Sequence, residues 1–204
     1  MINTLLRQEK IQNSINESIE LIVNCFKKKG KLLICGNGGS AADALHIVGE
    51  LRKKFLINHP LEKKFTQKLK KLFPNDLEFI QNNLQNAVPV ISLVNEISLM
   101  TAINNDSYPD LMFAQQLIGL GTKNDILLAI STSGKSNNII YAVKIAKCLD
   151  MKVVALTGKN NNLLSELADI TIHAPSIITY QIQEYHLMLY HYLCKEIEKQ
   201  LYSL

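Results

Sequence analysis

Residues 125–140 restrict the fold of this chain more than any other stretch. Residues 126–130 form an unbroken apolar run, which is typical of a strand buried on both faces of a parallel sheet. Residues 131–136 are small, polar or flexible, and apolar residues return from Ile139 at helical spacing. The sequence therefore predicts a strand, a hydroxyl-rich turn and a helix. Such a turn places hydroxyls and free backbone N–H groups at a helix N-terminus, which favours anion binding.

The rest of the chain repeats this alternation of strand and helix. Short apolar runs at 31–35, 89–94, 152–156 and 170–173 are each followed by a helical pattern. Alternating strands and helices imply a parallel sheet covered on both faces, with right-handed crossovers. We therefore expect one α/β domain over residues 1–204, a three-layer sandwich with a five-stranded parallel sheet. Ligands bind outside the carboxyl ends of such strands, so the loops after the strands share a crevice.

Two helical segments stand apart from this alternation. Residues 1–29 have apolar positions at helical spacing and end in lysines and a glycine, which predicts one long leading helix. It is expected either to pack on its own domain or to serve as an oligomer element. Residues 61–85 form a helical insertion with several lysines on its solvated side.

Composition disfavours several classes of protein. The net charge is only +4, the chain has no Trp, and no basic stripe alternates with aromatic residues, so no nucleic-acid partner is expected. No apolar run approaches the roughly 20 residues of a membrane helix, so no membrane association is expected. The first residues lack a signal-peptide pattern, which favours a cytoplasmic protein. The four cysteines are far apart and are expected to be reduced thiols.

The glycine-rich loop at residues 36–40 is the second candidate ligand loop. A dinucleotide-binding loop is disfavoured, because its third glycine would fall at Ala41 and no acidic residue closes a strand about 20 residues later. The glycines instead allow the backbone to approach a ligand closely. Asn37 and Ser40 add hydrogen-bonding groups.

Two helices carry side chains suited to acid–base chemistry or metal binding. His46 and Glu50 are four residues apart and share a helical face, where a plain surface ion pair is the simpler alternative. The closing helix, expected over residues 181–201, holds further candidates: Gln183, Glu184, His186 and His191. A lone helical histidine is more often structural. Two histidines, a carboxylate and an amide beside the ligand loops raise the expectation of a functional site.

These motifs resemble a known family. The Ser131-Thr-Ser-Gly-x-Ser136 loop resembles the phosphosugar-binding signature of SIS (sugar isomerase) domains. Three more segments, Cys35–Asp43 with His46 and Glu50, Asn105-Asp106, and Ile182–His191, extend the resemblance to phosphoheptose isomerases over about residues 15–200. The resemblance implies a flavodoxin-like SIS fold and isomerisation of sedoheptulose 7-phosphate, a phosphorylated seven-carbon sugar. It also implies a cytoplasmic homotetramer with one zinc per subunit.

The resemblance also assigns roles to particular residues of this chain. The positions implied to bind phosphate are Ser131, Thr132, Ser133 and Ser136. Those implied to contact the sugar are Asn37, Gly38, Gly39, Glu50, Asn105, Asp106 and Gln183. The implied zinc ligands are His46, Glu50, Gln183 and His191, and Glu50 and His191 are also the implied catalytic acid–base pair.

Two departures from the family leave the sugar open, and one of them is the helical stretch at about 61–85, which is longer than in the compact members. Where the family commonly has Gly-Arg-aromatic after the catalytic glutamate, this chain has Lys53-Lys54-Phe55, and Lys54 keeps the charge of the arginine but loses its bidentate fork. An isomerase of another sugar phosphate therefore remains an alternative. A SIS-domain regulator or adaptor that binds a phosphosugar without converting it is the other. Retention of His46/Glu50 and Gln183/His191 favours catalysis. The resemblance implies that the product feeds the synthesis of activated heptose for surface polysaccharide.

Overall fold

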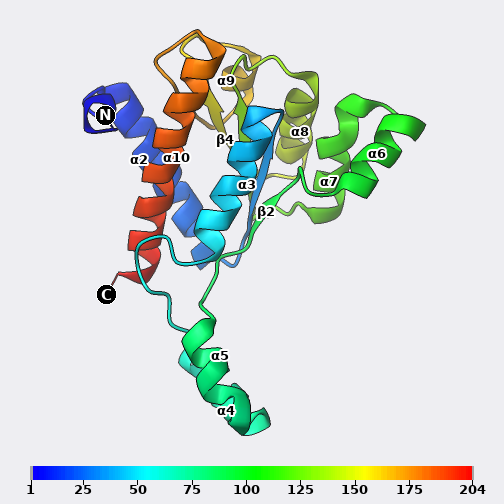
Figure 1. Ribbon diagram of the computed structural model, residues 1–204. Coiled ribbons are helices and arrows are strands. Elements are labelled where there is room, and N and C mark those ends of the chain that lie inside the picture. Colours follow the sequence, from blue (N-terminus) through cyan, green and yellow to red (C-terminus); the bar gives the residue numbers. More distant parts are fainter. Residues whose placement is uncertain (1, 204) are drawn as a thin grey trace.

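The structure, a computed structural model, describes residues 2–203 and is organised around a parallel sheet (Figure 1). Its five strands lie in the order β2-β1-β3-β4-β5, and every neighbouring pair is parallel. They are β1 (Leu32–Gly36), β2 (Val90–Ser92), β3 (Ile126–Ser131), β4 (Lys152–Thr157) and β5 (Ile170–His173). The predicted five-stranded parallel sheet is confirmed. The chain leaves β1 toward one edge and β3 toward the other, so a crevice opens between their carboxyl ends.

Helices cover both faces of this sheet, as predicted for a three-layer sandwich (Figure 1). On one face lie α2 (Glu9–Lys27), α3 (Gly39–Arg52) and α10 (Thr179–Tyr202). On the other lie α7 (Met112–Leu120), α8 (Asn137–Cys148) and α9 (Leu163–Leu167), with α6 (Ile97–Asp106) and the short η2 (Pro109–Leu111) beside them. Among residues 2–203, no helix is both long enough and apolar enough to cross a membrane.

The apolar runs of the sequence fill the two cores in alternation. Within β3, Leu127 faces the α7–α8 core and Leu128 faces the α2–α3–α10 core, and Leu33 and Ile34 of β1 divide in the same way. All four of these side chains are buried. Because strand residues point alternately to opposite faces, only a continuous apolar run supplies both cores. This explains why these strands could be recognised from sequence.

The predicted long leading helix is present, but it covers a shorter range than the predicted residues 1–29. The leading segment consists of α1 (Ile2–Leu5) and α2, with an extended backbone at Gln8 (φ −79°, ψ 105°) between them. The apolar face of α2 is buried against β5 and α10. Packing on its own domain is therefore the arrangement that the structure shows, and an oligomer role for the exposed face of α2 stays a prediction.

The segment at residues 61–85 projects away from the sheet as a helical arm (Figure 1). It contains α4 (Lys63–Leu72), the short η1 (Pro74–Asp76) and α5 (Leu77–Asn83), close to the helices predicted there. The lysines of α4 are exposed, and Leu69 is the one buried residue of this segment, every residue of which is described. The arm therefore adds little to the core of the domain.

Hydrogen bonds to the Asp125 carboxylate link the start of β3 to the start of β1. The Asp125→Asn substitution is therefore expected to destabilise the fold. Its carboxylate accepts hydrogen bonds from Lys31 N (2.8 Å), Lys31 Nζ (2.6 Å), and the N and Oγ1 of Thr122 (both 2.8 Å). Loss of these charge-assisted bonds should cost about 2–4 kcal/mol. Urea unfolding measures this cost, and exposed Asp150→Asn serves as the control, with an expected effect below about 0.5 kcal/mol.

The Asp125 contribution should also depend on pH. Burial raises the pKa of this carboxyl, but the hydrogen bonds from Lys31 and Thr122 outweigh burial and hold the pKa below its ordinary value. A group with a depressed folded-state pKa stabilises the fold above its unfolded pKa and loses that effect as the pH falls. The difference between wild type and Asp125→Asn should therefore be full above about pH 5 and shrink below about pH 4. A difference that stays constant down to pH 3 would contradict this role.

Candidate active site

Two loops meet at the crevice between the carboxyl ends of β1 and β3. Residues 37–38 lead from β1 into α3, and residues 132–136 lead from β3 into α8. Their spacing is fixed by a reciprocal amide pair: Asn37 Nδ2 donates to Asn138 Oδ1 (2.8 Å), and Asn138 Nδ2 donates to Asn37 Oδ1 (2.9 Å). Asn138 was not among the predicted site residues, and only its place at the start of a helix behind the hydroxyl loop could have suggested it.

The hydroxyl loop has the form that the sequence predicts. Ser131 Oγ accepts from Gly134 N (3.1 Å), and Ser133 Oγ accepts from Lys135 N (3.3 Å). Gly134 has φ +63°, a left-handed conformation that favours glycine, and this turns the chain toward the first residue of α8. Ser136 is the cap residue of this 12-residue helix. Hydroxyls and a helix N-terminus thus converge at one point, as anion binding requires.

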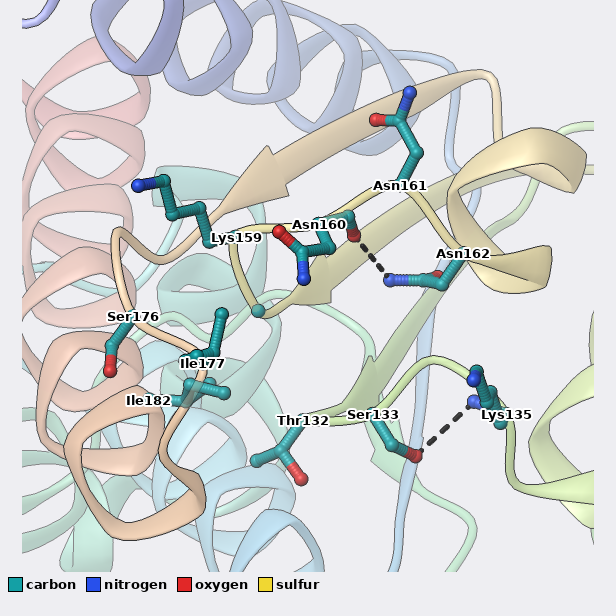
Figure 2. A pocket seen from close by; sticks show the side chains of 11 residues that line it. Thr132, Ser133, Lys135, Lys159, Asn160, Asn161, Asn162, Ser176, Ile177 and Ile182 are labelled. Carbon is teal, nitrogen blue, oxygen red and sulfur yellow. Dashed lines mark hydrogen bonds between the residues drawn. The ribbon is translucent and has the colours of Figure 1, made fainter.

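A polar cavity of about 280 Å³ adjoins this loop (Figure 2). Thr132, Ser133 and Lys135 form one side of it, and Lys159, Asn160 and Ser176 lie across from them on the loops after β4 and β5. Two lysines and several hydroxyl and amide groups in one hollow suit a negatively charged, hydroxyl-rich ligand.

The start of α10 reaches the first loop through Gln183. The Gln183 amide packs so closely on Gly39 that a Cβ added at Gly39 would lie 2.4 Å from Gln183 Nε2. A side chain at Gly39 would therefore force the Gln183 amide to move away from this position. The close contact places a side-chain amide of α10 at the mouth of the crevice, beside the loop implied to contact a sugar.

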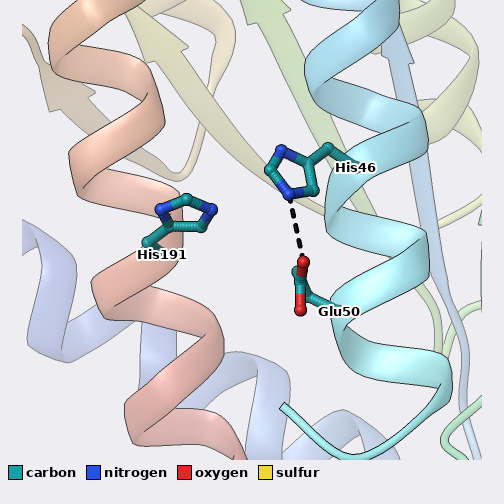
Figure 3. Close-up of side chains that lie close together, drawn as sticks. All are labelled: His46, Glu50 and His191. Atoms are coloured by element: carbon teal, nitrogen blue, oxygen red, sulfur yellow. Dashed lines mark hydrogen bonds and ion pairs between the residues drawn. The ribbon is translucent and has the colours of Figure 1, made fainter.

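Further along the same two helices, three predicted residues come together (Figure 3). His46 and Glu50 extend from α3 and His191 extends from α10 toward them. His46 Nε2 lies 3.0 Å from Glu50 Oε1, and the rings of His46 and His191 are 5.0 Å apart, edge to face. Ligand atoms of all three residues lie within 4.8 Å of one another. The structure thus joins residues 141 positions apart in the sequence, 50 and 191, into one cluster.

The electrostatic setting of the cluster favours a neutral His191. Burial lowers the pKa of His191, the neighbouring His46 lowers it further, and Glu50 opposes both effects. Phe55 covers one side, with its ring 5.8 Å from that of His191. A neutral imidazole beside a carboxylate can accept a proton, pass it on, or donate an electron pair to a metal.

The donor set of the cluster fits zinc. Two imidazoles and one carboxylate are ligands that catalytic zinc sites use, with a further position left for water or substrate. The fourth residue implied by the resemblance, Gln183, has its amide at Gly39, about two helical turns before His46. Its place among the zinc ligands stays a prediction.

Other candidates lie elsewhere. Asn105 and Asp106 are exposed at the end of α6, where Asn105 Nδ2 donates to Asp106 Oδ1 (2.7 Å), and α6 lies apart from α3 and α10 (Figure 1). Their sugar contacts stay predictions. His186 is fully buried beside Thr157 O (3.3 Å), and burial lowers its pKa to about 4, so it is a structural histidine. Glu184 is exposed on α10.

Several known proteins are similar to this chain in sequence and fold. The SIS domain family matches residues 2–86 and 93–193. A phosphoheptose isomerase of Shewanella loihica is 38% identical over 197 residues, which cover 95% of this chain and 87% of that protein. Solved phosphoheptose isomerases from Neisseria gonorrhoeae (32% identity, TM-score 0.74, 96% of this chain and 92% of that one) and Francisella tularensis (31%, 0.75, 97% and 96%) have the same architecture. The chain therefore belongs to the phosphoheptose isomerase family of SIS-domain proteins.

Proposed function

We propose that this protein is an aldose–ketose isomerase that converts sedoheptulose 7-phosphate to D-glycero-D-manno-heptose 7-phosphate. The observation that carries the proposal is the His46/Glu50/His191 cluster on α3 and α10, whose first turns meet where Gln183 packs on Gly39. The relatives of similar length are named phosphoheptose isomerases, which supports the same substrate here.

The phosphate end of the sugar would sit at the N-terminus of α8. Ser131, Thr132, Ser133 and Ser136 offer hydroxyls there, and the first N–H groups of α8 have no partner within the helix. Asn37, Gly38, Gly39 and Gln183 at the neighbouring loop, together with Asn105 and Asp106, would hold the hydroxyls of the sugar chain. Binding energy at this end helps hold the reacting carbons in place.

The reacting end would lie at the cluster between α3 and α10. Glu50 removes a proton from C1 of the ketose, which gives an enediolate with negative charge on the C2 oxygen. His191 takes the proton of the C1 hydroxyl and passes it to the C2 oxygen, and Glu50 returns its proton to C2, which leaves an aldose. Each proton removed is returned, so the reaction needs no oxidant or reductant.

Zinc, one ion per subunit, is part of this proposal. His46, Glu50, His191 and Gln183 would hold it. When bound, it would polarise the oxygens on C1 and C2 and stabilise negative charge there. Metal analysis of the purified protein checks this part: about one zinc per chain is expected, and activity that persists after removal of all metal by a chelator would contradict it.

The oligomeric state and the cellular location that the family resemblance implies are also part of this proposal. We place the enzyme in the cytoplasm as a homotetramer, with its product consumed by reactions that activate heptose for surface polysaccharide. The exposed face of α2 is available as an intersubunit surface.

Incubation of the purified protein with sedoheptulose 7-phosphate tests the function. Appearance of an aldose heptose 7-phosphate, detected by chromatography against a standard, supports the proposal. Binding without any conversion would instead indicate a phosphosugar-binding regulator or adaptor. Conversion only of another ketose phosphate would indicate an isomerase of a different sugar.

Ser133→Ala is expected to weaken substrate binding rather than the chemical step. The variant removes one hydroxyl from the phosphate loop, and a hydrogen bond to a charged group contributes about 1.5–3 kcal/mol. We therefore expect KM to rise about 10- to 100-fold with kcat little changed, as measured by initial rates. Ser203→Ala, at an exposed serine beyond α10, is the control. An unchanged KM in Ser133→Ala would count against the phosphate loop.

A further inference from the structure

The helical arm at residues 61–85 exposes apolar side chains that the domain does not cover. Leu69 is the one buried residue of this fully described segment. Five large apolar residues of the arm are 49–72% exposed: Phe65, Leu72, Phe73, Phe79 and Leu84. The helices α4 and α5 have only 10 and 7 residues, and isolated helices of such length are marginal in water. An arm built in this way gains stability when it packs against another surface.

The arm also separates its charges between its two halves. Its first helix, α4, has no acidic residue and carries five exposed lysines: Lys63, Lys64, Lys68, Lys70 and Lys71. The second half, η1 with α5, has no basic residue and carries Asp76 and Glu78. The ion pairs among residues 2–203 involve none of these lysines and neither carboxylate. One arm therefore presents a positive and a negative surface that are not paired with each other.

The two surfaces of one arm complement those of a second copy. In a two-fold symmetric contact, the same patch of both copies takes part, and every contact between two different residues occurs twice. When α4 of one arm lies along η1 and α5 of the other, its lysines meet Asp76 and Glu78. At about 100° per residue, Lys68 and Lys70 border the apolar side of α4, so they lie at the rim of such a contact. This suits a protein interface, in which charged residues are depleted at the centre and the rim is polar.

An anionic membrane surface fits the arm less well than a second copy does. Such a surface attracts a helix with lysines on one side and Phe or Leu on the other, which describes α4. However, Glu78 directly precedes Phe79, the most exposed of the five apolar residues, and Asp76 lies close by in the sequence. The negative charge of the lipids would repel these two carboxylates. A second copy of the arm satisfies both signs of charge.

The position of the arm leaves the ligand loops open. The helix α3 begins at the loop after β1 and runs back along the sheet, and the arm lies beyond its far end (Figure 1). Pairing of two arms therefore joins the copies at the end of the domain opposite to residues 37–38 and 132–136. Both loops stay accessible to a ligand.

We propose that the arm is a self-association surface that pairs with the arm of a second copy. In this pair, α4 of each copy lies along η1 and α5 of the other, with the exposed apolar side chains at the centre and the charges at the rim. The inference goes beyond the proposed function, because it concerns no residue of the active site and holds whether or not the protein converts a sugar.

The first test exchanges the charges of the arm. One variant carries Lys68→Glu and Lys70→Glu, a second carries Asp76→Lys and Glu78→Lys, and a third carries all four changes. Sedimentation equilibrium of the full chain over a range of concentrations gives the dissociation constant of self-association. We expect this constant to rise about 10- to 100-fold in each of the first two variants, because like charges then face each other. In the third variant the attraction is restored, and the constant should return to within about threefold of wild type.

This set of variants contains its own control for net charge. The first two variants change the net charge in opposite directions, and the third has the net charge of wild type. Wild-type association in both of the first two variants, or no restoration in the third, would overturn the proposal. A monomeric wild type would overturn it as well, and sedimentation of that monomer with vesicles of phosphatidylcholine and phosphatidylglycerol would then identify a membrane contact.

The second test removes an apolar side chain and leaves every charge in place. Phe79→Ser truncates a side chain that is largely exposed in the single chain, so the arm should keep its helices, which far-ultraviolet circular dichroism checks. The dissociation constant should rise about 10- to 100-fold. Leu163→Ser, at an exposed leucine on α9, is the control and should associate like wild type. Wild-type association in Phe79→Ser would overturn the proposal.

Discussion

Glu50→Gln should lower the rate of sedoheptulose 7-phosphate isomerisation about 10³-fold while substrate binding is largely kept. The amide is nearly the same size as the carboxylate, but it cannot take a proton from carbon. Glu50 lies in the cluster with His46 and His191, and its side chain is 18% exposed, so water and substrate can reach it. Initial rates and a direct binding measurement, such as titration calorimetry, separate the two effects.

The control for this prediction is Glu166→Gln. Glu166 is an exposed carboxylate on α9, and its replacement makes the same change in charge away from the cluster. Its rate should match that of wild type. If Glu50→Gln turns over substrate at the wild-type rate, Glu50 is not the base. If it loses substrate binding altogether, the separation of a binding end from a reacting end is wrong.

The strands and the two ligand loops could be predicted because their signals are local. A continuous apolar run such as 126–130 fits a strand with both faces buried, and the change to hydroxyl residues at 131 marks its end. The face of α3 that carries the cluster could likewise be predicted, because His46 and Glu50 are one turn apart.

The meeting of α3 and α10 could not be derived from such local signals. The sequence spacing places His46 and Glu50 on one face, but the approach of His191 depends on how α3 and α10 pack on the same face of the sheet. The family resemblance supplied that pairing in advance. The Asn37–Asn138 pair links two residues 101 positions apart, and no local pattern in the sequence predicts it.

The break in the leading helix has a similar explanation. Residues 2–27 have helical spacing almost throughout, and neither Pro nor Gly interrupts them. The chain nevertheless turns at Gln8, and α1 then contacts α10. Tertiary packing therefore decides the direction of this segment, and helix propensity does not.

A buried glutamate near the end of α10 holds the loop that follows α3, and no sequence pattern predicts this contact. Glu198 is 3% exposed and accepts hydrogen bonds from the backbone N–H groups of Phe55 (2.7 Å), Leu56 (2.8 Å) and Ile57 (3.0 Å). His59 Nε2 lies 2.8 Å from the same carboxylate, and the His59 ring stacks on Tyr202. Because Phe55 packs against His191, this loop connects Glu198 to the His46/Glu50/His191 cluster.

Glu198→Ala is therefore expected to reduce the free energy of unfolding by about 3–5 kcal/mol, the usual cost of removing one partner from a buried charged pair. Three backbone N–H groups and His59 would lose their shared acceptor, and the loop that holds Phe55 over His191 would loosen. Urea unfolding measures the loss.

Glu196→Ala, two residues earlier on α10, is the control. It removes ion pairs with Lys195 and Lys199, whose side chains are both more than half exposed. We expect it to change the free energy of unfolding by less than about 0.5 kcal/mol. Equal stability of the two variants would show that the Glu198 contacts contribute no more than a surface ion pair. Since folded domains are commonly stable by only about 5–15 kcal/mol, the expected loss is a large share of the total.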